Sequence, residues 1–336
     1  MLLKQLCEMD GVSGNEHGIR AFLKERVQAV ADKITVDPMG NLIVFKKGKR
    51  HDKSIMVAAH MDEVGLIISN ITEDGYLKFK TVGGIDTRVL ISKRVRMGQV
   101  KGVIGIKAIH LQSKAERDSV PKEKELYIDI GAASKAEAEK MIPLGTYAAF
   151  DTEYADFGDE KIKAKALDDR VGCMVLLRAL EQPCEVDLYA CFTVQEEVGL
   201  RGAQTAAHRV RPDLALVLES TTCSDVCGTE EKDFVTRLGG GVALSFMDRS
   251  TIVDKPYRQW IESLAKEANL PFQYKSTTMG GNDAGAIHQA REGVKTASLS
   301  VPCRYLHSPV GIVSKKDICA MEELTFLILK RIGEVI

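Results

Sequence analysis

Two adjacent carboxylates, Glu196 and Glu197, follow an apolar run that extends from Val186 to Val194. The run predicts a buried strand, and the glycines Gly199 and Gly202 predict a turn directly after it. In open α/β sheets the carboxyl edge of the strands holds the binding crevice. A turn that begins at Glu196 would aim both side chains inward, so that one carboxylate holds a metal and the other acts as a base. The pair alone is equally typical of the acidic first turn of a helix.

Other apolar segments also stop at potential metal ligands. They end at His60 and Asp62, at Asp168 and Asp169, at Glu219, and at His307. Taken singly, such an aspartate caps a helix, such a glutamate opens a loop, and such a histidine is a hydrogen-bonded core residue. Together they place imidazoles and carboxylates on one edge of a sheet, a donor set that suits zinc, cobalt or manganese. Because thiols are too few for a structural zinc site, the combination predicts catalysis at a metal centre.

The amino-terminal part of the chain predicts two helices followed by three strands. Ser13 and Glu16 have the spacing of a capping box before the amphipathic run Ile19 to Val30. The stretch Asp37 to Asn41 predicts a turn between two short strands. The continuous apolar segment Ser54 to His60 predicts a strand that is covered on both faces.

Helices and strands alternate again after Lys165. We expect helices at Asp168–Leu180 and Lys255–Ala268, strands at Leu214–Leu218 and Lys295–Val301, and a terminal helix from Lys315 onward. This alternation predicts an α/β fold, a mainly parallel sheet sandwiched by helices.

Between residues 70 and 163 the pattern changes to short β-rich pieces punctuated by glycine, with one short helix near Lys135 to Met141. These pieces predict a small β-barrel or sandwich. The expected organisation is a discontinuous catalytic domain of residues 1–69 and 164–336, with residues 70–163 inserted as a barrel domain that mediates oligomer contacts.

Composition limits the classes of partner and compartment. The formal net charge of −1 argues against a surface that binds nucleic acid or anionic membranes. The amino terminus lacks the apolar run of a signal peptide, so we expect a cytoplasmic protein. Several of the eight cysteines lie inside apolar runs, which suits reduced thiols. Cys223 and Cys227 form a CxxxC pair, but no second pair follows, so metal binding there is weakly indicated.

Five motifs resemble one family in combination: HMDEVG, ALDDRVG, TVQEEVGLRGA, GGNDAGAIH and RYLHSPVG. They are similar to those of the tetrahedral dinuclear-metal aminopeptidases, which include glutamyl and deblocking aminopeptidases and some members labelled cellulase or endoglucanase. The similarity covers nearly the whole chain. It implies a fold of the co-catalytic zinc exopeptidase type, and an inserted barrel that builds dimers and from them a tetrahedral homododecamer.

The resemblance also implies roles for individual residues. Two divalent metals, zinc or cobalt in the first place and manganese as an alternative, would share a bridging water that attacks the first peptide bond of a peptide with a free amino terminus. Glu196 would be the general base, and Asp62 would hydrogen-bond and orient the metal-binding His60. The implied metal ligands are His60, Asp168 and Glu219 at one metal, and Asp168, Glu197 and His307 at the other. The family more commonly has aspartate where Glu219 stands.

The glycine-rich run at Gly281, Asn282 and Asp283 would shape the substrate site. An equally good interpretation is a helix entry, with Asn282 or Asp283 as its cap.

Three other functions remain to be distinguished. A related dinuclear amidohydrolase would trim carboxyl termini or acyl groups, and an assay with free and N-acylated substrates separates it. A glycoside hydrolase would also use paired carboxylates, but it leaves His60 and His307 without a role and has only Trp260 as a sugar platform. A non-catalytic descendant is disfavoured because every ligand position is intact. Neither the preferred first residue of the substrate nor the metal follows from the sequence.

Overall fold

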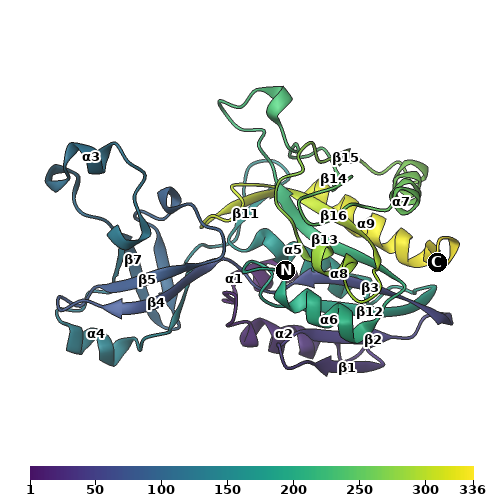
Figure 1. Cartoon of the computed structure of the whole chain (residues 1–336), viewed down its shortest axis with the longest axis horizontal. Helices are drawn as coiled ribbons and strands as arrows, with labels where there is room; N and C mark the ends of the chain where they lie inside the picture. The colour runs from purple at the N-terminus through teal and green to yellow at the C-terminus, as the bar shows by residue number, and fades with distance from the viewer.

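The computed structural model describes all residues from 1 to 336 and divides the chain into a helix-covered sheet and a separate barrel (Figure 1). The sheet has eleven strands, nine of them in the order β1-β2-β12-β3-β13-β16-β17-β11-β10, with β14 and β15 paired beside β16. The barrel closes in the order β4-β5-β8-β7-β6-β9. The predicted α/β fold class with an inserted β-barrel is therefore confirmed, but the sheet is mixed where the sequence predicted a mainly parallel one.

Four neighbouring strands at the centre of the large sheet are parallel, and the strands beside them pair antiparallel, except that β14 and β15 pair with each other in parallel. The central strands are β12 (Val186–Thr193), β3 (Arg50–His60), β13 (Leu214–Thr222) and β16 (Lys295–Arg304). The flanking strands are β1 (Lys33–Val36), β2 (Leu42–Lys46), β10 (Ala155–Asp156), β11 (Lys161–Ala164), β14 (Val242–Leu244), β15 (Phe272–Tyr274) and β17 (Gly311–Ser314). Because parallel strands all end at the same edge, their last residues meet there.

Helices cover both faces of this sheet because successive strand side chains point to opposite sides. In β3, Ile55, Val57 and Ala59 join the larger core with residues of α1 (Leu2–Glu8), α2 (His17–Val27), α5 (Leu167–Ala179), α7 (Lys255–Glu267) and α9 (Lys315–Arg331). Met56 and Ala58 join the opposite core with α6 (Arg201–Val210) and α8 (Asp283–His288). The short helix predicted at Lys135–Met141 is present as α4.

The barrel strands are β4 (Gly65–Ile71), β5 (Leu77–Val82), β6 (Arg94–Met97), β7 (Val100–Gly105), β8 (Tyr127–Asp129) and β9 (Tyr147–Phe150). All are antiparallel, and they enclose a separate hydrophobic core. The predicted division at residues 70 and 163 lies within β4 and β11, because β4 already belongs to the barrel while β10 and β11 pair in the large sheet. None of the helices has the length and apolar character needed to cross a membrane.

One local prediction is wrong. Ser13 and Glu16 form no capping box at α2, whose first residue is His17 and whose amino terminus has no side-chain cap. Ser13 Oγ instead donates to Asp62, and Glu16 accepts the backbone N–H of Gln195. Long-range partners have replaced the local ones, since both side chains are buried beside the end of β12.

Candidate active site

The residues singled out in the sequence converge at the carboxyl edge of the four parallel strands. His60 ends β3, Glu219 lies near the end of β13, and the Glu196–Glu197 pair follows β12. His307 follows β16, and Asp168 lies at the start of α5. The convergence of these segments was predicted from their positions after apolar runs.

Asp168 lies between the two histidines. Its Oδ1 is 3.4 Å from His60 Nε2, and its Oδ2 is 3.5 Å from His307 Nε2. Glu219 Oε2 is 3.7 Å from His60 Nε2, and Glu197 Oε2 is 3.2 Å from His307 Nε2. The five side chains thus form two groups that share Asp168.

Asp169 is a further member of the cluster. Donor atoms of His60, Asp169 and Glu219 lie within 4.8 Å of one another, as do those of His60, Asp168 and Glu197. The sequence placed Asp169 at the end of the same apolar segment as Asp168, but the family resemblance implied only Asp168 as a metal ligand. Both residues have non-helical backbone angles at the start of α5, and Asp169 is fully buried.

The cluster holds more acidic than basic groups, and pKa values shift accordingly. Burial raises the pKa of Glu219 and of Asp169 well above their ordinary values. Burial and the Asp168 carboxylate raise the pKa of Glu197 to about 8. Burial alone would lower the pKa of His307, but Asp168 and Glu197 raise it to about 9. Because buried carboxylates outnumber basic groups here, binding of a cation would stabilise the site.

The donor set fits a divalent metal. Asp168 Oδ1, Asp169 Oδ2 and Glu219 Oε1 are buried and have no hydrogen-bond partner in the protein. Buried carboxylate oxygens without a donor are costly unless a cation binds them. A cavity of about 20 Å³ lined by Asp168, Glu197 and His307 leaves space beside them. Oxygen and imidazole ligands of this kind suit zinc, cobalt and manganese.

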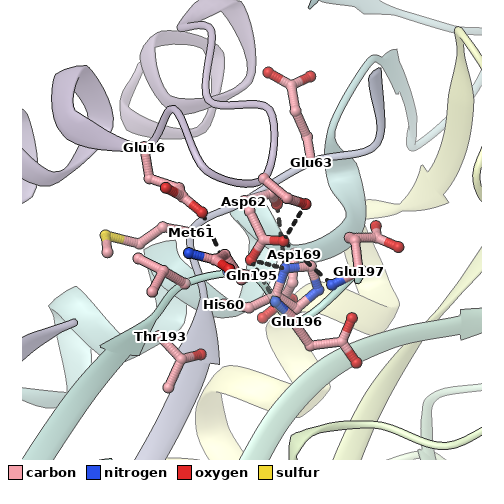
Figure 2. A network of polar contacts seen from close by, with 12 residues as sticks. Glu16, His60, Met61, Asp62, Glu63, Asp169, Thr193, Gln195, Glu196 and Glu197 are labelled. Atoms are coloured by element: carbon pink, nitrogen blue, oxygen red, sulfur yellow. Dashed lines mark hydrogen bonds and ion pairs between the residues drawn. The ribbon is translucent and has the colours of Figure 1, made fainter. Parts of the chain in front are cut away.

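Asp62 orients both His60 and the glutamate pair (Figure 2). His60 Nδ1 lies 3.1 Å from the Asp62 backbone carbonyl oxygen and 3.4 Å from the Asp62 carboxylate oxygen Oδ1. Both acceptors hold the proton of a neutral imidazole on Nδ1, which leaves Nε2 facing Asp168. The Asp62 carboxylate accepts the N–H groups of Glu196 at 3.0 Å and Glu197 at 3.2 Å, and the hydroxyl of Ser13 at 2.6 Å. Despite its burial, His60 and these donors lower the pKa of Asp62.

Glu196 stands apart from the two groups, with none of the ion pairs that its neighbours make. Burial, together with the carboxylates of Asp283 and Glu197, raises its pKa well above the ordinary value. A carboxyl group with a raised pKa beside candidate metal ligands is suited to proton transfer.

The glycine-rich run has a mainly structural part. Asn282 Oδ1 accepts the N–H of Ala284 and caps α8. Asp283 is fully buried and accepts a hydrogen bond from the Thr193 hydroxyl at 2.6 Å, so its side chain has no surface for a substrate. Gly281 is exposed. In the CxxxC pair, Cys223 Sγ lies 2.9 Å from Asp225 while Cys227 is exposed, and neither belongs to a group of metal-binding side chains.

A buried ion-pair network behind the site was not predicted. Lys165 Nζ lies 2.7 and 2.8 Å from the two Glu63 oxygens, and Arg170 Nε donates to the Met61 carbonyl at 3.0 Å. These bonds tie the segment after β3 to the start of α5, which fixes His60 relative to Asp168. The sequence offered no periodic signal for such buried charges, which are rarely found in protein cores.

Residues 40–324 match the family model described as M42 glutamyl aminopeptidase. The chain belongs to the M42 family. Its members include a lysyl aminopeptidase of Pyrococcus furiosus, which is 34% identical over 327 residues, 94% of this chain and 92% of the relative. The predicted family and the assignment of the chain as an aminopeptidase-type hydrolase are therefore confirmed.

Solved structures of M42 aminopeptidases share the whole fold. An aminopeptidase from Desulfurococcus kamchatkensis has a TM-score of 0.94 and 38% identity, covering 98% of this chain and 94% of the other. The TET1 peptidase of Pyrococcus horikoshii has a TM-score of 0.86 and 34% identity, covering 98% of both chains. That peptidase is described as assembling into a tetrahedron or a large octahedral shell.

Proposed function

We propose that this M42 protein is a dinuclear metal-dependent aminopeptidase that cleaves the first peptide bond of peptides with a free amino terminus. The observation that carries the proposal is the position of Asp168, each of whose oxygens faces a different histidine. Asp168 would join the two metals, His60 and Glu219 would complete one site, and Glu197 and His307 the other. Asp169 adds a carboxylate beside His60 and Glu219.

When bound, two divalent cations would polarise the scissile carbonyl and lower the pKa of the attacking water. Glu196 would accept a proton from that water on its carboxylate and later donate it to the leaving amine. Asp62 would keep the His60 proton on Nδ1 and hold the amides of the glutamate pair in place. The proton carrier and the ligands therefore remain in fixed relation through the reaction.

The free α-amine of a peptide would be held by the same acidic cluster, which restricts cleavage to the first bond. An aminoacyl anilide with a free amine and its N-acetylated form test this restriction, each assayed with added zinc, cobalt or manganese and with a chelator. We expect the enzyme to cleave only the anilide with a free amine, and we expect the chelator to abolish this activity. Preferential cleavage of the acetylated substrate would instead indicate a deacylase, and activity that withstands complete metal removal would contradict the proposal.

We further propose that the chain forms a large closed homo-oligomer, as the description of the related TET1 peptidase supports. The barrel, which stands away from the helix-covered sheet in Figure 1, offers a separate surface for such contacts. Light scattering should give the mass of a dodecamer. A monomer at micromolar concentration would overturn this assembly and leave the proposed chemistry unaffected.

A further inference from the structure

The turn that carries Glu196 and Glu197 begins where the ladder of β12 ends, so its N–H groups need other acceptors. Four consecutive N–H groups, those of residues 194–197, are accepted by side chains. The acceptors are in order Asn41 Oδ1, Glu16 Oε1, Asp62 Oδ1 and Asp62 Oδ2, at 3.1, 3.1, 3.0 and 3.2 Å. All three acceptor residues come from the first 62 residues of the chain.

The backbone of this turn needs support because Gln195 has a φ of +55°. Left-handed backbone is unfavourable for residues other than glycine. Without such a residue, side chains that follow β12 would continue to alternate between the two faces of the sheet. The left-handed backbone at Gln195 therefore allows both glutamates to face the site. The hydrogen bond from the Gln195 N–H to Glu16 stabilises the residue whose backbone conformation is least favourable (Figure 2).

Glu16 is held in position to accept this hydrogen bond. Its side chain is buried, and the same Oε1 also accepts the N–H of Gly14 at 2.8 Å. Glu16 Oε1 is therefore held both by Gly14 in its own segment and by Gln195 in the turn. Burial raises the pKa of Glu16, and the two backbone donors oppose that rise. Glu16 makes none of the ion pairs or ligand contacts of the acidic cluster.

The neighbouring acceptor, Asn41, is fixed in a similar way. Its Nδ2 donates to Asp37 Oδ2 at 2.7 Å and to the Gly202 carbonyl at 3.0 Å, which leaves Oδ1 for Val194. A Cβ at Gly202 would collide with Asn41 Oδ1 and with the Val194 backbone. Asn41 can therefore reach the Val194 N–H only because residue 202 of α6 is glycine.

We propose that Glu16 is a positioning residue, whose Oε1 holds the Gln195 amide and thereby directs Glu196 and Glu197 into the active site. The kinetic part of this inference rests on the proposed function, since it takes turnover as the readout. The hydrogen-bond part does not, because it concerns the exchange of backbone amides.

Three substitutions separate the acceptor from the charge and the volume of the side chain. Glu16→Gln keeps Oε1, Glu16→Met has similar length without an acceptor, and Glu16→Ala removes the side chain. Asp317→Ala is the matched control, because Asp317 is another fully buried carboxylate that accepts two backbone N–H groups, those of Gly239 and Gly241, at 2.7 Å each.

We expect Glu16→Met to lower kcat by about ten- to a hundredfold, as loss of supporting hydrogen bonds does elsewhere, with little change in KM. Hydrogen–deuterium exchange of a peptide that covers residues 194–197 should become faster in the same variant. Glu16→Gln should restore both properties. Asp317→Ala should accelerate exchange at residues 239–241 only and leave kcat unchanged.

Equal losses of kcat in Glu16→Gln and Glu16→Met would overturn the proposal, because the charge and not the acceptor would then matter. Unchanged exchange at residues 194–197 in Glu16→Met would also overturn it. If that variant does not fold, Glu16→Ala provides the same comparison without crowding. A wild-type protein without aminopeptidase activity would contradict the proposed function, while the exchange pattern would still decide the role of Glu16.

Discussion

Replacing Asp62 with asparagine should cost both stability and activity, because both oxygens of this buried carboxylate accept hydrogen bonds. Oδ1 accepts the Glu196 amide, and Oδ2 accepts the Glu197 amide and the Ser13 hydroxyl. In either orientation, the asparagine NH₂ would face one of the two backbone N–H groups. The variant loses one hydrogen bond to a charged acceptor, about 1.5–3 kcal/mol, and leaves a buried N–H unpaired, about 1–3 kcal/mol.

The expected sum for Asp62→Asn is a loss of about 2.5–6 kcal/mol in the free energy of unfolding. That is a large share of the roughly 5–15 kcal/mol of a typical domain. Denaturant unfolding at neutral pH measures it, and kinetics on the folded protein should show kcat lowered by about ten- to a hundredfold. Asp317→Asn, which disturbs two comparable amide bonds, should lose similar stability but keep its kcat. If Asp62→Asn unfolds like the wild type and keeps its kcat, the reasoning from these bonds is refuted.

Three further predictions follow from individual contacts. Asp168→Ala should lower the occupancy of both metal sites together, because its oxygens face both histidines, and metal analysis showing two full sites would contradict this. Burial raises the pKa of Asp317 to about 6, so the folded protein binds this proton more tightly than the unfolded chain and stability falls as pH rises from about 4 to about 6. Between pH 5 and pH 8, unfolding of the wild type compared with Asp317→Asn should therefore show a relative loss of about 1.4 kcal/mol, and no pH-dependent difference would count against it. Gly202→Ala should lower the stability of the protein by about 1–3 kcal/mol and should lower kcat, because the added Cβ collides with the Val194 backbone just before the glutamate pair. Gly18→Ala, at a helical position with open space around it, should be neutral or stabilising.

The sequence predicted the convergence of the site because its signals are strong and repeated. Each parallel strand is a buried apolar run, and each run stops at a polar residue that the sheet topology brings to one edge. Helices with clear periodicity, such as α7 and α9, were likewise predicted close to their observed bounds.

What the sequence could not predict depends on partners distant in the chain. The capping-box spacing of Ser13 and Glu16 is a local pattern, but their buried surroundings offer Asp62 and Gln195 as partners. The Glu63–Lys165 pair lies 102 residues apart in sequence, so neither residue identifies the other. Asp283 follows a glycine run that suggested substrate contact, but the short α8 buries its side chain beneath the end of β12.

The most direct test of the account is Glu196→Gln, with metal content and turnover measured on the same preparation. Glutamine preserves the backbone N–H bond to Asp62 and the shape of the side chain but cannot take a proton from water. The account predicts two bound metals per chain and a kcat lowered by about 10²–10⁴-fold. A variant that turns over near the wild-type rate would contradict the role of Glu196 as the base, and a variant that loses its metals would show that Glu196 acts as a ligand.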